Sequence, residues 1–594
     1  MGPGSNEVMR HATFFLISTV ALSGCSAAWY RSSADEEVAE ILRHERKSVL
    51  GEENRFVLTQ VPSRLESEGK AGETEDLRRT PEPKPVILSL NVQNSAQNAP
   101  GVAGASNTPV PDGAQSATGA SPSPVPLIAT HILDLRGALR LAFHNNRDYQ
   151  AQKEALYLSA LSLTLAQHQF APRFLGIITG DWSRDSNGEA GSVAPSTGWN
   201  LLFVNGARLS VTVVQSFFQF FTGDRREVAQ TIVGGSLTQP LLRGFGTEVV
   251  REPLTQAERG VTYQVRAFER FRKTFAVIVI TEFYRVLENR DRVSNSYLNW
   301  QSLVTNRDRV EALANAQKRP PFEVGQARQD ELRAQDEWSS AAQIYESALD
   351  RFKVTLGITA DQEVTLLQDE LLNLIRESVE PLDRPVEEAI QAALLSRLDL
   401  KTERDLLEDS IRRIRVGEDG LRAQLDLNAN AALASSGGRS QTPLKLNSAN
   451  GAYGFGFDLN LPLDRKAERN AYVAALIDLE SRKRSLSLFE DSVRLTVRDA
   501  YRRLEREIVS FRIQKISLAL AAERVESTSL FFQAGRAETR DVLEAQASLN
   551  TARNALTSAL INYAVARLEV LRDTESLRVT DGGEVILLPL RKEI

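Results

Sequence analysis

Few residues in this chain have the types and spacing that catalysis or metal binding requires. The chain has five histidines, none of them in a metal-ligand spacing: His11, His44, His131, His144 and His168. A single cysteine excludes a thiol pair. Gly244-Phe245-Gly246 lacks the third glycine of a nucleotide-binding loop, and no Gly-x-Ser-x-Gly sequence occurs. We therefore expect no catalytic residues, no metal site and no cofactor, and we predict that the protein is not an enzyme.

The single cysteine has the surroundings that favour covalent lipid attachment. Cys25 ends a Leu-Ser-Gly-Cys box that begins at Leu22, directly after the mostly apolar run 12–22. This arrangement is similar to a bacterial lipoprotein signal, which is cleaved so that the new N-terminal cysteine carries lipid. The pattern predicts a signal peptide over 1–24, a lipid such as palmitate on Cys25, and, because Ser26 follows, sorting to the outer membrane. The alternative is an ordinary signal peptide with an incidental cysteine.

Two carboxylates near the C-terminus have a spacing that suits a charged surface. Asp541 and Glu544 are three residues apart, so on a helix they share one face. Such a pair either lines a polar passage or forms an ordinary solvated helix face. The helices on which they lie must decide between these interpretations.

Those helices have the heptad pattern of a coiled coil that folds back at 532–535. Before this turn, apolar residues recur at gaps of mostly three and four: Val493, Val497, Tyr501, Leu504, Ile508, Phe511, Leu518, Ala522 and Val525. They predict a helix over 466–530, about 100 Å long at ~1.5 Å per residue. After the turn, an alanine stripe recurs every seven residues: Ala545, Ala552, Ala559 and Ala566. Alanine in one stripe lets two antiparallel helices approach closely along their length.

The same design occurs earlier in the chain and predicts a two-fold internal repeat. The sequence 322–325 mirrors 532–535, and 237–243 mirrors 459–465. The earlier copy has its own alanine stripe: Ala327, Ala334, Ala341 and Ala348. We therefore expect one repeat over 133–356, a connector over 357–383 and a second repeat over 384–577. Each repeat should contain a helix, strands, a long helix, a turn and a return helix, with the first long helix over 253–317 and its return helix over 326–356.

Strand-like segments separate the helices in each repeat. The first repeat has four such segments, with an Asn205-Gly206 hairpin signal between the middle two: 173–182, 199–204, 207–214 and 230–239. The second repeat has two, 421–432 and 452–461. In the last segment, apolar residues alternate with small or polar ones, a pattern typical of an outer-membrane strand. We expect two spanning strands from each repeat, with a strand of a soluble sandwich as the alternative.

About four spanning strands per chain cannot close a barrel, since about eight is the practical minimum. Open strand edges cannot face lipid, because their backbone groups would lack hydrogen-bond partners. The sequence therefore predicts that several copies share one barrel.

The remaining segments connect and anchor this architecture. The charged sequence of residues 25–50 predicts an anchored helical segment. We expect a disordered linker over 51–132, which is rich in Pro, Ala, Ser and Gly, and a C-terminal tail over 578–594. The net charge of −6, with 25% charged residues, gives no reason to expect nucleic-acid binding.

Three features resemble the outer-membrane efflux proteins of the TolC type. These are Leu237-Thr238-Gln239-Pro240-Leu241-Leu242-Arg243-Gly244, the two Phe-x-x-Gly turns, and Asp541-Val542-Leu543-Glu544-Ala545-Gln546. The resemblance covers about 133–577. It implies an α+β fold: a homotrimer with a twelve-stranded β-barrel in the outer membrane, continued by an α-helical tunnel across the periplasm. It also implies docking on a periplasmic adaptor protein and an inner-membrane pump, for the export of drugs, toxic small molecules, metal ions or secreted proteins.

The resemblance also implies roles for particular residues. Four residues at the helix tips would contact the adaptor: Phe322, Gly325, Phe532 and Gly535. Asp541 and Glu544 match an acidic ring at the closed end of the tunnel, although this chain has Glu where the family has Asp at 544. Ala537 stands where some relatives carry a basic gate-linking residue. The alternatives are a purely structural turn and, for the whole protein, a lipid-tethered periplasmic coiled-coil scaffold with a soluble sheet domain.

Overall fold

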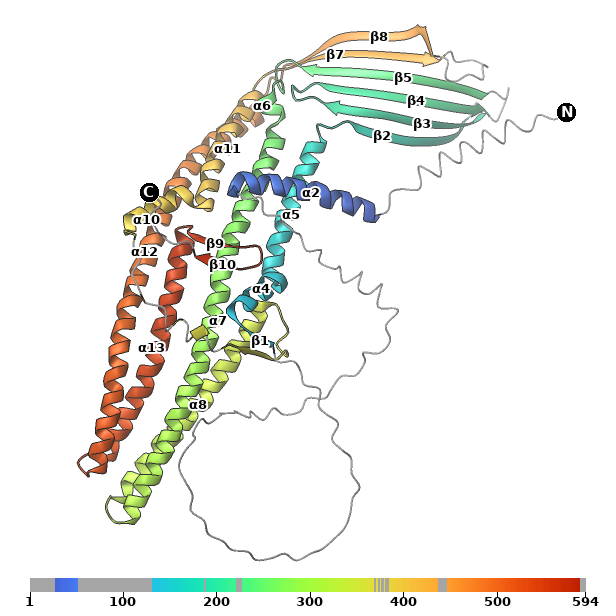
Figure 1. Cartoon of the computed structure of the whole chain (residues 1–594). Coiled ribbons are helices and arrows are strands. Elements are labelled where there is room, and N and C mark those ends of the chain that lie inside the picture. The colour runs from blue at the N-terminus through green and yellow to red at the C-terminus, as the bar shows by residue number, and fades with distance from the viewer. Residues whose placement is uncertain are drawn as a thin grey trace, which may run out of the picture. The chain divides into compact units, whose positions relative to one another are not determined.

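Long helices and a curved six-stranded sheet, with two small two-stranded sheets, make up the described part of this computed structural model (Figure 1). It describes residues 27–51, 131–185, 188–220, 227–367, 384–435 and 446–587, and positions 370, 371, 374 and 379. The helices are α2 Ala27–Leu50, α4 Leu135–Asn145, α5 Arg147–His168, α6 Thr247–Val250, α7 Glu252–Asn315, α8 Pro321–Leu356, α10 Val386–Ser396, α11 Leu398–Gly420, α12 Lys466–Gln533 and α13 Thr539–Asp573. The strands are β1 His131–Leu133, β2 Arg173–Asp185, β3 Gly188–Leu202, β4 Arg208–Phe220, β5 Glu227–Pro240, β6 Val364–Leu366, β7 Gln424–Ser435, β8 Leu446–Asn460, β9 Leu577–Val579 and β10 Val585–Leu587.

The predicted signal peptide, the predicted lipid site Cys25 and residues 52–130 of the predicted linker lie outside the described residues. Within the described part, no helix is both long and apolar enough to cross a membrane.

The two long helices agree closely with the heptad pattern. The helix expected over 466–530 is α12, with 68 residues, and the one expected over 253–317 is α7, with 64 residues. Each is followed by a return helix, α13 or α8. The return helix α8 begins at Pro321 and not near 326, because proline at the first helical position is already fixed at a helical φ.

The single helix expected at the start of the first repeat is instead two helices, α4 and α5. Asn146 between them has an extended backbone, and its side-chain oxygen accepts a hydrogen bond from the Tyr149 N–H, so it caps the second helix. The single helix expected at the start of the second repeat also divides, at Arg397, into α10 and α11. The two short helices α4 and α10 have 11 residues each. The two-fold repeat itself stays a prediction.

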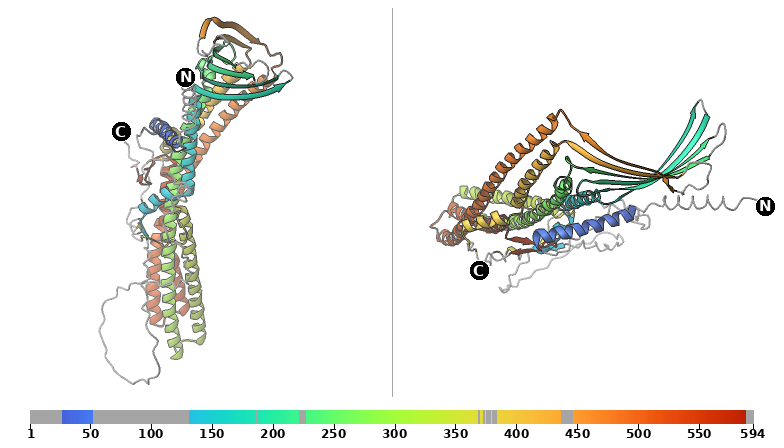
Figure 2. Two further views of the ribbon diagram at one scale, coloured as in Figure 1. Left: turned by 90° about the vertical axis from the view of Figure 1, so that its right-hand side faces the viewer. Right: turned by 90° about the horizontal axis from the view of Figure 1, so that it is seen from above.

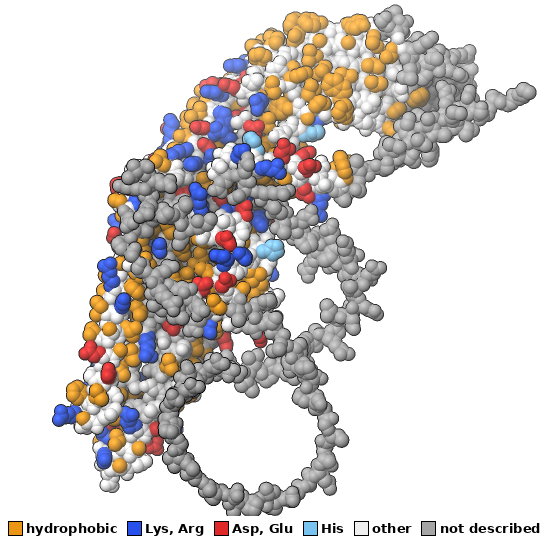
Figure 3. Space-filling model, viewed as in Figure 1, with side chains coloured by type: hydrophobic (Ala, Val, Ile, Leu, Met, Phe, Trp, Pro, Cys, Tyr) orange, Lys and Arg blue, Asp and Glu red, His pale blue; other side chains and the backbone are white. Residues whose placement is uncertain are grey.

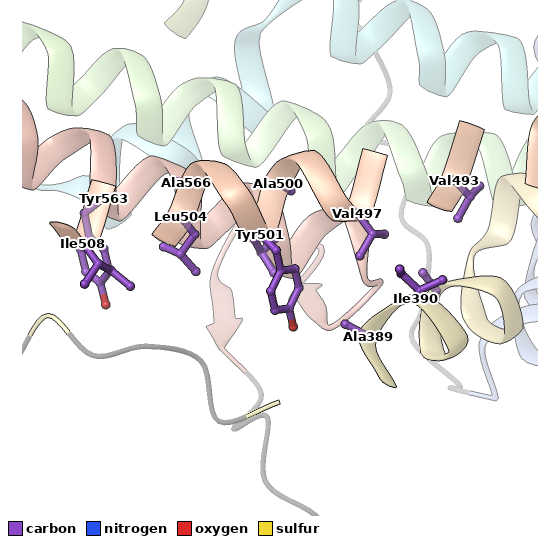
Figure 4. Close-up of a cluster of buried hydrophobic side chains, with 12 residues drawn as sticks. Ala389, Ile390, Val493, Val497, Ala500, Tyr501, Leu504, Ile508, Tyr563 and Ala566 are labelled. Carbon is purple, nitrogen blue, oxygen red and sulfur yellow. The ribbon is translucent and has the colours of Figure 1, made fainter. Parts of the chain in front are cut away.

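The core between the helices is built from the predicted heptad positions. Val497 and Leu504 of α12 pack with Tyr563 and Ala566 of α13 and with Ile390 of α10 in one buried cluster (Figure 4). All four alanines of the α13 stripe are buried, as are the first three of the α8 stripe: Ala327, Ala334 and Ala341. Small side chains therefore form the buried faces of the return helices α8 and α13.

The sheet has six strands in the order β2-β3-β4-β5-β7-β8, all antiparallel and visibly curved (Figure 2). β5 of the first half pairs with β7 of the second half. One row of paired residues crosses all six strands and is mostly apolar: Phe174, Trp199, Val211, Gly235, Ala431 and Tyr453. The next row is mostly polar: Arg173, Asn200, Ser210, Ser236, Asn430 and Gly454. Because successive residues point to opposite faces, the sheet has one apolar and one polar face.

β3 and β4 extend well beyond the predicted segments 199–204 and 207–214. How many of the six strands span a membrane stays a prediction. β3 begins at Gly188, where the sequence is dominated by Gly, Ala and Ser and shows no alternation. Pro195 lies in this part of β3, and proline removes a ladder hydrogen bond. In the structure, Pro195 pairs with Ile178 of β2, and the β3–β4 register omits it, so its missing N–H disrupts little.

Short strands form at the end of the predicted linker and in the predicted C-terminal tail. Residues 131–133, at the end of the predicted linker, form β1, which pairs in parallel with β6. β9 and β10 form an antiparallel hairpin within the predicted C-terminal tail, and Leu577 and Val579 are buried. Residues 27–50 of the segment expected to be helical form α2. Its Asp35 accepts a 2.7 Å hydrogen bond from the Tyr157 hydroxyl of α5.

Candidate functional site

The two helix turns, where adaptor contacts were expected, differ in geometry. The turn between α12 and α13 contains Gly535, whose φ of +70° suits glycine. The turn between α7 and α8 contains Gln317, also at positive φ (59°), and ends at Pro320. The expectation that Gly325 lies in this turn is wrong. Pro320 and Pro321 start the helix α8 earlier, so Gly325 is helical.

The two predicted phenylalanines have opposite environments. Phe322, in the first turn of α8, is 71% exposed, whereas Phe532 is 4% exposed. Phe532 packs with Val310 of α7, Ala327 of α8 and Val542 of α13. Phe532 is therefore a core residue joining the two helix pairs and does not offer its ring to a partner, contrary to the sequence-based prediction.

Polar contacts that the sequence analysis missed also join the two pairs at this end. The Arg319 guanidinium donates to the Ala537 carbonyl at 2.7 Å and lies 5.1 Å from the centre of the Phe532 ring. The Thr539 hydroxyl donates to buried Glu323 at 2.5 Å. No local pattern signals these contacts, because they join residues more than 200 positions apart. We call Arg319, Glu323, Phe532, Ala537 and Thr539 the tip cluster.

The two predicted acidic residues lie near the tip cluster, but each already has a partner. The Asp541 carboxylate accepts a 3.0 Å hydrogen bond from the Glu538 N–H, which closes a capping box at the start of α13. Glu544 is half exposed and forms a 3.0 Å ion pair with Arg524 of α12. Part of the charge of Glu544 is therefore balanced within the chain.

A second charged cluster joins α7 to the end of α13 and the start of α11. Arg270 donates to the Arg572 carbonyl at 2.8 Å and forms ion pairs with Asp573 and Glu575 at 3.2 and 3.0 Å. Asp399 accepts from Arg397 at 2.7 Å. Burial raises the pKa of Asp399, but the hydrogen bond and charge of Arg397, together with the charge of Arg270, outweigh it, so the pKa is lowered overall.

The apolar face of the sheet exposes several large hydrophobic side chains. Figure 3 shows hydrophobic side chains gathered over the sheet, while charged side chains gather over the helices. On this face Phe174 and Ile178 of β2 are 81% and 76% exposed, and Tyr453 and Phe455 of β8 are each 71% exposed. A contiguous exposed apolar surface of this kind marks a lipid or protein contact.

No group of histidine, cysteine and carboxylate side chains in the described ranges has a metal-binding arrangement. The features that stand out are thus a contact surface, a helical tip and charged clusters between helices.

Of the comparisons with known proteins, only the one with solved structures found matches. No protein-family model matches the sequence, and no curated protein matches it significantly. Solved structures do match. The Campylobacter jejuni CmeC outer membrane channel aligns with a TM-score of 0.54 at 14% identity, covering 76% of this chain and 86% of that one.

Two further outer-membrane proteins align equally well. For VceC from Vibrio cholerae the TM-score is 0.55 at 12% identity, covering 74% of this chain and 95% of that one. For the open state of the Neisseria gonorrhoeae MtrE channel it is 0.55 at 13% identity, covering 74% and 88%. The described part of the chain therefore has the fold of the TolC-type outer-membrane channels.

Proposed function

We propose that this protein is the outer-membrane channel of a tripartite export system: a passive homotrimeric duct without catalysis of its own. The observation that carries the proposal is that one chain joins an amphipathic, open-edged sheet to two pairs of long antiparallel helices. The sheet supplies a surface for lipid, and the helices supply the wall of a tunnel below it. The fold that it shares with outer-membrane channels supports the same conclusion.

The helices also carry a surface suited to a second copy. Leu488, Leu495, Val509 and Ile516 of α12 are exposed and recur at multiples of seven residues. An apolar heptad stripe on a helix surface is the usual contact of a coiled coil. Packing of this stripe on a neighbouring copy would close the helices into a ring.

The lipid anchor stays part of the proposal. Cys25 is two residues before α2, whose first turn exposes Trp29 and Tyr30. Tryptophan and tyrosine are favoured at the membrane–water interface. A lipid on Cys25 would hold this end of α2 at the outer membrane of a bacterial cell, while the long helices extend into the periplasm.

Partner binding is assigned to the helix tips. Exposed Phe322 and the turns at Gln317 and Gly535 would meet the periplasmic adaptor, which links the duct to an inner-membrane pump. Asp541 and Glu544 remain the candidates for an acidic ring at the pore constriction. The Arg524 partner of Glu544 would weaken its attraction for cations.

The proposal is tested first by the mass of the protein in mild detergent, measured by light scattering and corrected for bound detergent. We expect a trimer that aggregates when detergent is removed. A detergent-independent soluble monomer or dimer would exclude the duct and favour the alternative, a lipid-tethered periplasmic scaffold.

A pair of charge substitutions then tests which face of the sheet meets lipid. Phe455→Arg places a charge on the apolar face, which costs about 2–4 kcal/mol near the membrane midplane. Ala452→Arg places the same charge on the opposite face of the same strand. We expect Phe455→Arg to reduce the amount of assembled protein in outer membranes and Ala452→Arg to leave it unchanged. Equal effects would contradict a lipid-facing surface.

A further inference from the structure

The two outer strands of the sheet each have a partner strand on one side only within the described part of the chain. β2, with 13 residues, pairs only with β3, and β8, with 15 residues, pairs only with β7. Both strands exceed the ~9–11 residues that a membrane strand needs. In lipid, the unpaired N–H and C=O groups of such edges must be satisfied by another strand.

The hairpin of β3 and β4 has the same two faces as the rest of the sheet. Leu201 and Leu209 lie in one row with Leu237 of β5, and this row continues to Ala429 and Phe455. Because all the pairings are in register, the apolar surface crosses the hairpin without interruption. The hairpin therefore forms part of the same continuous wall as the other four strands.

The polar face is equally continuous across the hairpin. Asn200 of β3 and Ser210 of β4 lie between Arg173 of β2 and Ser236 of β5 in one row. A hairpin lying outside a barrel wall would not need to place small polar residues in line with those of its neighbours. Both faces thus indicate six wall strands in each chain.

We propose that three copies of this chain close one barrel of eighteen strands, with β8 of each copy paired to β2 of the next. The trimer is taken from the proposed function, and the six strands come from the structure. Because neighbouring strands alternate in direction, the two outer strands of a six-stranded sheet run in opposite directions. Pairing of β8 with the β2 of another copy is therefore antiparallel and continues the existing ladder.

Eighteen wall strands would change the width of the barrel relative to the tunnel. Barrel diameter grows about linearly with strand number, so eighteen strands give a barrel ~1.5 times as wide as the twelve that the resemblance implies. Each chain still supplies the same two long helix pairs to the tunnel. The barrel is therefore wider relative to the tunnel, and the helical part sets the size limit for cargo.

Electron cryomicroscopy of the full-length protein in lipid nanodiscs tests the proposal directly. We expect three copies and eighteen wall strands, with β3 and β4 in the wall. Twelve wall strands with the β3–β4 hairpin outside them would overturn the proposal, and so would two copies that close twelve strands. A trimer with either arrangement of the hairpin leaves the export function standing, whereas a soluble monomer would exclude that function as well.

Disulfide trapping tests the pairing of the edges independently. Each of Phe174→Cys, Ile178→Cys and Trp182→Cys in β2 is combined in one chain with each of Tyr453→Cys, Phe455→Cys, Phe457→Cys and Leu459→Cys in β8. We expect dimers and trimers on non-reducing denaturing gels for the pairs in register, and monomers for every single variant, which also controls for Cys25. Products confined to internally linked monomers would mean that one chain closes its own sheet, and this would overturn the proposal.

Discussion

Thr539 at the start of α13 donates a 2.5 Å hydrogen bond to Glu323 at the start of α8, across 216 positions of sequence. Both residues are buried, with 1% and 8% of their surfaces exposed. Together with the hydrogen bond from Arg319 to the Ala537 carbonyl, this contact joins the tip of the α7–α8 pair to the tip of the α12–α13 pair. The tip cluster is thus a fixed junction within each chain, beside the exposed Phe322.

Removing this hydrogen bond should loosen the tip. Thr539→Val deletes the donor and leaves Glu323 buried without it, at a cost of about 1–3 kcal/mol. We expect faster amide hydrogen exchange in 316–325 and 534–541, with unchanged exchange in the N-terminal half of α12, which lies away from the tip. Thr551→Val, on the exposed side of α13, is the matched control and should change neither region. Unchanged exchange at the tips of Thr539→Val would contradict the role of this contact.

In the proposed channel, the ion pair of Arg524 with Glu544 predicts how charge near the helix tips affects ion selectivity. Arg524→Gln leaves the carboxylate unbalanced, so the cation-to-anion permeability ratio in planar bilayers should rise. Glu544→Gln should lower it, and the double variant should lie between the two. If the ratio does not respond to any of the three variants, Glu544 does not lie in the ion path.

The buried alanine stripe of α13 predicts that the stability of the protein depends sharply on side-chain size at these positions. Ala552 is 5% exposed at the close approach of the helices, so Ala552→Leu should destabilise the protein by about 1–3 kcal/mol through overpacking. Ala547, on the same helix, is exposed, and Ala547→Leu serves as the control. Thermal unfolding in detergent should show a lower midpoint for the first variant alone. Equal midpoints would show that the interface has room to expand.

The lowered pKa of Asp399 predicts that its contribution to the stability of the protein is lost at acid pH. Because its pKa is lowered in the folded protein, its contribution is present above its ordinary pKa of about 4 and is lost as pH falls through the lower folded value. Asp399→Asn should therefore lower the unfolding midpoint at pH 7, and this difference should shrink below about pH 4. A difference that stays constant over this range would indicate that the charge of Asp399 does not matter.

Lipid attachment is predicted for one residue and is simple to test. Cells grown with labelled palmitate should incorporate the label into the protein, and Cys25→Ser should abolish it. The fold of the Cys25→Ser protein is expected to be unchanged, since Tyr157 of α5 holds α2 through Asp35 independently of lipid. A label that persists in the variant would place the lipid elsewhere.

The sequence by itself determined the helices, because their pattern is local. The heptads of α7 and α12, the alanine stripes, and the left-handed turn at Gly535 depend on residues a few positions apart. The same patterns carried the resemblance to outer-membrane channels, and the fold agrees with it. Phe532 lies in the last turn of α12 and not in the turn that follows, and its burial depends on Val310 and Ala327, more than 200 residues away.

Only the tertiary structure decided the lengths of β3 and β4, the pairing of the strands and the contacts of the tip. Pairing of Leu237 with Ala429 joins the two halves of the chain, and no local signal specifies such a pair. The Gly- and Ser-rich start of β3 has almost no periodicity of its own. It forms a strand because β2 and β4 on either side satisfy its backbone groups, so its conformation is set by neighbours and not by side-chain preference.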